Sequence, residues 1–306
     1  MDIKAKSTVI LNSLFIFIFS FFTQISLASS ISIQEKQSSS HSPWSFSYFG
    51  LYSQEFDSID KGGGRLSSYN YITSSYRLDG DNKVAFRLPF SINSAGFDDF
   101  NGNANQEQEA LLQDFIISYT DYNLILLPLD IGVYWEARWY LPTSKFSRDT
   151  KMISRFRNDF IFSKYLTSRN VFEYTSKFNY YYQSQSVYKN DFTDENGFDV
   201  SVSSRTKRFY HDHWLSYWYR FSHNFSLGFL TGWEDTYYNK SSVNEGRNKP
   251  GKHEYKIGPQ VAFELSSNAN FIFQISDNVI NDENRDELGQ FKTENAEMTL
   301  LAFVRF

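Results

Sequence analysis

The chain ends in the segment EMTLLAFVRF (297–306), which decides the fold class. Side chains of two kinds alternate along it. One face of an extended strand would carry Met298, Leu300, Ala302, Val304 and Phe306, and the other Glu297, Thr299, Leu301, Phe303 and Arg305. Because a period of two residues is that of a β-strand, the segment predicts a strand with an apolar face and a face that carries charge.

The same alternation recurs upstream. Residues 129–140, 212–221 and 254–265 each place apolar or aromatic side chains at every second position and polar or small ones between them. In the first of these segments, Leu129 begins the apolar set and Asp130 the polar one. The sequence therefore predicts an all-β protein.

The spacing of the breaks between these strands indicates what surrounds them. Short turn signals occur at 79–82, 121–123, 167–170, 223–224 and 266–268, and longer polar segments separate them at 57–65, 94–108, 142–150, 185–206, 240–251 and 281–290. A soluble sandwich also alternates, but a strict exchange of short and long connections is typical of a transmembrane barrel with tight periplasmic turns and longer extracellular loops. We therefore expect an antiparallel up-and-down β-barrel of about twelve strands, with both termini periplasmic.

The composition agrees with this interpretation. The 306 residues are 41% hydrophobic, 19% aromatic and 21% charged, and there is no Cys. A mean hydropathy of -0.47 excludes a bundle of apolar membrane helices, since each would need about 20 apolar residues in a row. A net charge of -5 argues against a nucleic-acid binder.

The N-terminus reads as an export signal. Lys4 and Lys6 precede an apolar stretch from Val9 to Phe22, and Ala28 offers a small residue for cleavage. We expect residues 1–28 to be a signal peptide, 29–43 a flexible periplasmic tail and 44–306 the barrel domain.

The aromatic residues predict where the two membrane interfaces lie, because outer-membrane barrels carry a girdle of rings at each. The residues expected in these girdles are Trp44, Trp139, Phe172, Tyr174, Tyr180, Tyr182, Tyr255 and Phe271.

Taken together, the chain resembles a Gram-negative outer-membrane β-barrel protein of the porin-like class. The signal peptide, the twelve-strand rhythm and the last strand, with Leu300 and Val304 behind the terminal Phe306, carry this resemblance. It implies an integral outer-membrane location, contact with lipid and lipopolysaccharide, and recognition of Phe306, Val304 and Leu300 by the barrel assembly machinery. No motif ties the chain to a particular porin.

Charged residues on the polar faces are the candidates for function. A charge that faces lipid near the midplane costs roughly 2 to 4 kcal/mol, so we expect these residues to line the lumen. The predicted pore-lining set is Arg87, Asp114, Glu136, Arg138, Arg155, Arg157, Asp159, Asp212, Arg220, Glu234, Glu264 and Glu297. The mixed signs favour a weakly selective channel for passive diffusion of small hydrophilic solutes. The alternative is a non-conducting barrel, held shut by paired charges, with a structural or loop-mediated binding role.

Catalysis and metal binding have weaker support. Barrel phospholipases use His and Ser two residues apart on a lipid-facing strand, and no His-x-Ser occurs here. His211 and His213 would share the outward face with Leu215, and two imidazoles are too few to indicate a metal site. We expect no enzyme activity, no cofactor, no metal and no nucleic-acid partner.

Overall fold

The computed structural model describes residues 42–55, 66–94, 96–98, 103–106, 109–193, 199–240, 251–280 and 296–306. The predicted signal peptide, the predicted tail up to residue 41 and most of the predicted loops at 57–65, 240–251 and 281–290 lie outside these residues. No helix in the described part of the chain is long and apolar enough to cross a membrane.

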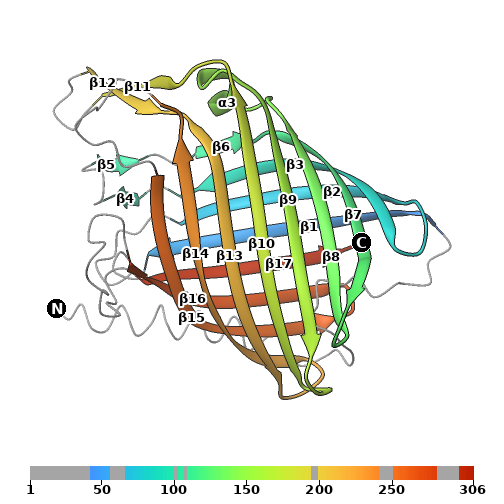
Figure 1. The fold of residues 1–306 in the computed structure, drawn as a ribbon. Helices are drawn as coiled ribbons and strands as arrows, with labels where there is room; N and C mark the ends of the chain where they lie inside the picture. Colours follow the sequence, from blue (N-terminus) through green and yellow to red (C-terminus); the bar gives the residue numbers. More distant parts are fainter. Residues whose placement is uncertain are drawn as a thin grey trace, which may run out of the picture.

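Within the described residues, twelve antiparallel strands form the wall of a barrel (Figure 1). They are β1 (Trp44–Glu55), β2 (Ser67–Arg77), β3 (Asn82–Asn93), β7 (Phe115–Leu127), β8 (Ile131–Leu141), β9 (Met152–Tyr165), β10 (Asn170–Gln183), β13 (Lys207–Arg220), β14 (Phe225–Tyr238), β15 (Gly251–Ser266), β16 (Ala269–Ile280) and β17 (Ala296–Arg305). The predicted fold class and strand number are confirmed.

The first and last strands close the barrel. β1 pairs with β17 on one side and with β2 on the other, and β2 pairs in turn with β3. Every wall strand therefore has two hydrogen-bonded neighbours, which is what lipid requires, because an open sheet edge cannot find hydrogen-bond partners there. The backbone N–H of Phe306 donates to the carbonyl of Phe46 at 2.9 Å, so both ends of the barrel domain lie at the same end of the wall.

Four of the five predicted short turns are where the sequence placed them, at 78–81, 166–169, 221–224 and 267–268. The first turn is held by the carboxylate of Asp79, which accepts hydrogen bonds from the backbone N–H groups of Asp81 and Asn82, each at 2.8 Å. The Asn82 side-chain amide also donates to both oxygens of this carboxylate, each at 3.0 Å. These contacts, and after them the two backbone hydrogen bonds, lower the pKa of Asp79 from its ordinary value.

The prediction of a turn at 121–123 is wrong, because these residues belong to β7. The N–H of Tyr122 donates to the carbonyl of Asp81, and the amide of Asn123 donates to the Asp81 carboxylate. The polar triplet thus binds the neighbouring β2–β3 turn. The backbone N–H of Asn123 also donates to the Asp121 carboxylate at 3.0 Å, but the strand continues through these residues. β7 continues, with a register irregularity, to a turn at 128–130, where Leu129 and Asp130 adopt φ of 66° and 54°. These two residues are therefore not in a strand.

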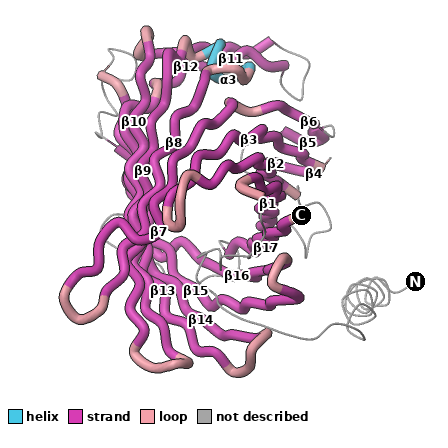
Figure 2. The backbone as a smooth tube through the Cα atoms, turned by 90° about the vertical axis from the view of Figure 1, so that its right-hand side faces the viewer, coloured by secondary structure: helices cyan, strands magenta, loops and turns pink. Residues whose placement is uncertain are grey.

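The long connections lie at the opposite end of the barrel. The hairpin of β11 (Val187–Thr193) and β12 (Asp199–Arg205) and the short helix α3 (Lys145–Asp149) gather there, as Figures 1 and 2 show. β6 (Glu109–Leu112) continues β7 alongside β3, and β4 (Gly96–Asp98) pairs with β5 (Asn103–Gln106). We call this the loop end and the other the turn end.

Alternate side chains point to opposite faces of the wall. On β14, Leu227, Phe229 and Trp233 are 38 to 45% exposed on the outer face, while the inward Ser226 and Leu230 are buried. Gly228 also faces inward, and a Cβ there would lie 2.4 Å from the ring of Trp218. Glycine at this position lets that indole lie flat against the wall, at the turn end of the lumen.

Candidate functional site: the inner wall of the barrel

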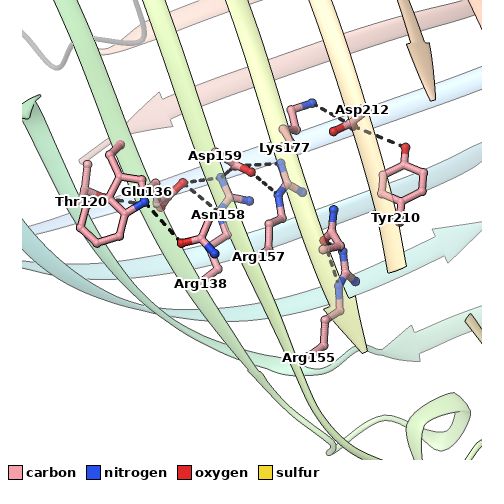
Figure 3. Close-up of polar contacts among 12 residues, drawn as sticks. Thr120, Glu136, Arg138, Arg155, Arg157, Asn158, Asp159, Lys177, Tyr210 and Asp212 are labelled. Atoms are coloured by element: carbon pink, nitrogen blue, oxygen red, sulfur yellow. Dashed lines mark hydrogen bonds and ion pairs between the residues drawn. The ribbon is translucent and has the colours of Figure 1, made fainter. Parts of the chain in front are cut away.

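Two neighbouring strands, β8 and β9, bring five of the predicted pore residues together: Glu136, Arg138, Arg155, Arg157 and Asp159. The register pairs Glu136 with Asp159, Arg138 with Arg157, and Tyr140 with Arg155. Since the side chains alternate, the residues at every second position on each strand all face the lumen. The outcome is a patch of inward charge about halfway along the wall (Figure 3).

Four of these residues, together with the predicted pore residue Arg87 on β3, form a continuous set of ion pairs. We call this set the inner charge cluster: Arg87, Glu136, Arg138, Arg157 and Asp159. Glu136 binds Arg87 and Arg138, and Arg138 also reaches Asp159 at 3.2 Å. Arg157 holds Asp159 with two hydrogen bonds, Nε to Oδ1 at 2.6 Å and Nη2 to Oδ2 at 2.8 Å. Such fork-like contacts are among the stronger hydrogen bonds in proteins.

The acidic side chains of this cluster are less exposed to solvent than two of its arginine side chains. The side chains of Glu136 and Asp159 are 2% and 6% exposed, whereas those of Arg138 and Arg157 are 15% and 20% exposed. The carboxylates therefore lie beneath the guanidinium groups of Arg138 and Arg157, whereas the Arg87 side chain is nearly as buried as the carboxylates, at 8% exposed. Lumen water meets the positive ends of these pairs first.

Further pairs continue around the wall. Lys177 on β10 lies 3.5 Å from Asp212 on β13, and Lys256 on β15 lies 3.8 Å from Glu297 on β17. The hydroxyl of Tyr210 also donates to Asp212, at 3.4 Å. Each lumen ion pair named so far joins residues of one strand or of strands adjacent or two apart in the sheet. These pairs run along the wall and do not bridge the lumen.

Arg155 differs from the other arginines of the patch. It lies between Tyr140 on β8 and Tyr181 on β10, with its guanidinium carbon 4.1 Å and 5.0 Å from the two ring centroids. Its Nε and Nη2 donate to the side-chain oxygen of Asn179, at 3.2 and 2.6 Å. Within the described residues, no carboxylate pairs with Arg155.

The remaining predicted pore residues are spread along the barrel. Asp114 lies at the loop end, where its carboxylate accepts hydrogen bonds from the Ser144 N–H and the Ser147 hydroxyl and so holds α3. The backbone N–H groups of Arg220 and Glu264 bind turn residues at the other end. Glu234 lies in register between Asp212 and Glu254. The structure thus gathers the central charges and separates Asp114, Arg220 and Glu264 from them.

Uncharged residues of the patch were passed over because the prediction considered charges alone. Tyr140, Asn179 and Tyr181 all contact Arg155, and Asn179 is completely buried. Each lies an even number of residues from a charged residue on its own strand, so the alternation of side chains could have placed it on the inner face.

The residues predicted for the aromatic girdles share the outer face. Trp44, Trp139, Phe172, Tyr180 and Tyr182 are 38 to 49% exposed. Tyr255 is in register with Trp233, and Phe271 with Phe263. On the last strand, Leu300 and the terminal Phe306 are also exposed.

Tyr174 is part of a polar chain on the outer face. Its hydroxyl contacts Nδ1 of His213, Nε2 of His213 lies 3.1 Å from Nδ1 of His211, and Nε2 of His211 lies 3.3 Å from the Ser176 hydroxyl. We call these four residues the outer histidine chain. Each ring nitrogen has a partner, so protons arranged in one direction along the chain leave both imidazoles neutral. Within the described residues no group of three or more His, Cys, Asp or Glu could hold a metal ion.

Comparison with known proteins supports the fold. No protein-family model and no curated protein matches the chain. Among solved structures, the chain is similar to an outer membrane channel from Pseudomonas putida F1, with a TM-score of 0.57 and 11% identity over 90% of this chain and 100% of that one. More distant likenesses are the NanC porin (TM-score 0.41, 9% identity, 85% and 98% covered) and LpxR from Salmonella typhimurium (TM-score 0.39, 7% identity, 85% and 99% covered).

The class of the protein follows from this fold and its two faces. A closed twelve-strand barrel with an apolar outer face and a charged inner face meets the demands of a bilayer. The chain is an integral β-barrel protein of the bacterial outer membrane.

Proposed function

We propose that the protein is a porin-like channel through which small hydrophilic solutes diffuse passively. The observation that carries this proposal is the direction of the ion pairs: the inner charge cluster and the Lys177–Asp212 and Lys256–Glu297 pairs run along the wall. Charges that are paired in this way line a path with polar groups and leave the lumen unbridged by these pairs. Rings of charged side chains are a common lining of aqueous pores.

Two other functions are less well supported. A non-conducting barrel would act through its loop end, where α3 and the β11–β12 hairpin gather. A hydrolase would need an activated nucleophile, and Ser176 does lie beside His211. However, Nδ1 of that imidazole binds His213, where a serine hydrolase uses a carboxylate to orient the base.

The absence of cysteine makes a direct test possible, because a single introduced thiol has no competitor. Thr175 on β10 faces the lumen, in the same parity as Lys177, and Thr231 on β14 faces outward, where its hydroxyl binds that of Tyr255. Thr175→Cys and the matched control Thr231→Cys would be refolded and inserted into planar bilayers. A charged, water-soluble methanethiosulfonate reagent would then be added.

A conducting lumen predicts steady single-channel openings for both variants. The reagent should lower the conductance of Thr175→Cys in one step and leave that of Thr231→Cys unchanged. A folded protein that shows no openings would overturn the channel and favour the non-conducting barrel. Openings that the reagent leaves unchanged in Thr175→Cys would place the conducting path elsewhere.

A further inference from the structure

We propose that the lumen contains a binding subsite for a small organic or inorganic anion, centred on Arg155 and completed by Arg157 and Asn179. The ligand would present carboxylate or phosphate oxygens. This proposal rests on the proposed function, because it takes the lumen to be the path of the solute, and it gives that path a chemical preference.

The first support is the local charge. Arg87, Arg138, Arg155 and Arg157 stand against two carboxylates, Glu136 and Asp159, so this part of the wall has a formal excess of two positive charges (4 − 2). The two carboxylates are already paired and nearly out of reach of water. The acidic side chains therefore neutralise their arginine partners without presenting negative charge to a solute in the lumen.

The second support is the state of the Arg155 guanidinium. Arginine has five N–H donors in a planar fork. The structure commits two of its nitrogen atoms to a single acceptor, the side-chain oxygen of Asn179. Tyr140 and Tyr181 flank the group and fix its position by cation–π contact. The remaining N–H groups, which lack a carboxylate partner among the described residues, are pre-positioned for acceptor oxygens of a ligand.

The third support is an unsatisfied donor at the same place. The side-chain nitrogen of Asn179 is buried and has no hydrogen-bond partner in the described part of the chain, because the oxygen of that amide is turned toward Arg155. Asn179 is in register with Arg157, whose side chain is one of the more exposed of the cluster. Three neighbouring side chains thus offer donors and no free acceptor. An unpaired buried donor costs free energy, which an anion oxygen at this place would recover.

The position of this subsite favours capture from the loop end. β9 begins at the loop end with Met152, so Arg155 and Arg157 lie nearer that end than Asp159 does. The row of inward carboxylates, Glu136, Asp159, Asp212 and Glu234, is one step deeper, toward the turn end. A solute that enters from the loop end therefore meets the Arg155 guanidinium before it meets the acidic row.

Two measurements test the subsite on the full-length refolded protein. The first is the chloride-to-potassium permeability ratio, obtained from the reversal potential in a KCl gradient. The second is calorimetric titration of the protein in detergent with succinate and, separately, with inorganic phosphate. Arg155→Gln removes the charge, and Arg155→Lys retains it without the fork. Asn179→Asp replaces the amide donor with a carboxylate oxygen, which repels an anion. Arg148→Gln, at an exposed arginine of α3, is the matched control.

We expect Arg155→Gln and Asn179→Asp to lower the permeability ratio and to weaken binding of the preferred anion by about threefold to tenfold. Arg155→Lys should give values between those of these variants and those of the unaltered protein. Arg148→Gln should change neither the permeability ratio nor the binding. Because Arg155 has no ion-pair partner among the described residues, its replacement leaves none of their carboxylates without a counter-charge and should not impair folding. Comparison of succinate with phosphate identifies which acceptor the site prefers.

The two readouts separate the subsite from the channel. Anion binding that depends on Arg155 in a protein that does not conduct would retain the subsite and overturn the channel. A conducting protein whose permeability ratio and anion binding are the same in Arg155→Gln as in the unaltered chain would overturn the subsite and retain the channel. An equal effect of Arg148→Gln would reduce the result to general surface charge, and the subsite would again be rejected.

Discussion

The inner charge cluster and the outer histidine chain hold polar groups on opposite faces of the same wall. Inside, Arg87, Glu136, Arg138, Arg157 and Asp159 meet as full charges. Outside, on the neighbouring strands β10 and β13, Tyr174, His213, His211 and Ser176 meet as groups that can all be neutral. The two clusters use different chemistry to satisfy the same need for hydrogen-bond partners.

The difference shows how the surroundings select the kind of polar contact. A lumen that holds water can solvate the outer edge of an ion pair, as the exposed fractions of Arg138 and Arg157 indicate. Hydrocarbon cannot, so a charge on the outer face costs several times more than a neutral hydrogen-bonded group. A sequence that places polar residues on both faces of its strands can therefore still form a barrel. The condition is that the polar residues on the outer face form hydrogen bonds between neutral groups.

The largest effect should come from removing a carboxylate of the inner charge cluster. In Glu136→Gln, Arg87 and Arg138 lose their common counter-charge at a position that is 1% exposed. Breaking a buried pair from one side leaves an uncompensated charge, so we expect the free energy of unfolding to fall by about 3 kcal/mol. Guanidinium titration of the protein in lipid vesicles, followed by tryptophan fluorescence, would measure this.

Asp130→Asn is the matched control for this variant. Asp130 also loses an ion pair, with Lys164 at 3.9 Å, but its side chain is 91% exposed in the turn at 128–130. Asparagine tolerates the positive φ of this position, so we expect a change within about 0.5 kcal/mol. Equal losses in the two variants would show that lumen burial does not set the strength of the cluster.

Much of the fold could be predicted from the sequence, because each strand carries its own signal. A period of two fixes which side chains share a face, and the lengths of the connections fix the order of turns and loops. The failure at 121–123 has a cause distant in sequence: Asp121 and Asn123 look like turn residues, but Tyr122 and Asn123 bind Asp81 of another turn. Hydrogen bonds between segments distant in sequence leave no mark on the local pattern.

The site could be predicted only in part for the same reason. The two-residue alternation of side chains predicted that Arg155, Arg157 and Asp159 share one face of one strand. The partners of these residues, however, depend on the register of neighbouring strands. Nothing in the sequence separates the paired Arg157 from Arg155, which binds an amide and two rings. Likewise, Ser176 and His211 are 35 residues apart, so a search for His and Ser on one strand could not find their contact.

A second prediction places one new charge on each face at adjacent residues of β13. Leu215 is 44% exposed on the outer face, while Ser216 faces the lumen in register with Glu173. We expect Leu215→Lys to lower the free energy of unfolding in vesicles by about 2 kcal/mol, because the ammonium group must face hydrocarbon. Ser216→Lys gains a carboxylate neighbour and should change it by less than about 1 kcal/mol. The reverse order would mean that the outer face of β13 is not against lipid.

The smallest of the three effects should come from interrupting the outer histidine chain. In His211→Phe, Nε2 of His213 and the hydroxyl of Ser176 each lose a partner, although the new ring would lie among those of Phe178 and Phe209. Each unmade hydrogen bond in surroundings without water costs about 1 kcal/mol, and packing of the new ring against Phe178 and Phe209 offsets part of the cost of the two. We therefore expect the free energy of unfolding to fall by about 1 kcal/mol. The control is His223→Phe in the exposed turn at 221–224, where we expect no loss. If His211→Phe is as stable as the unaltered protein, the outer histidine chain does not stabilise the barrel. Its remaining polar groups must then bind water that reaches this depth.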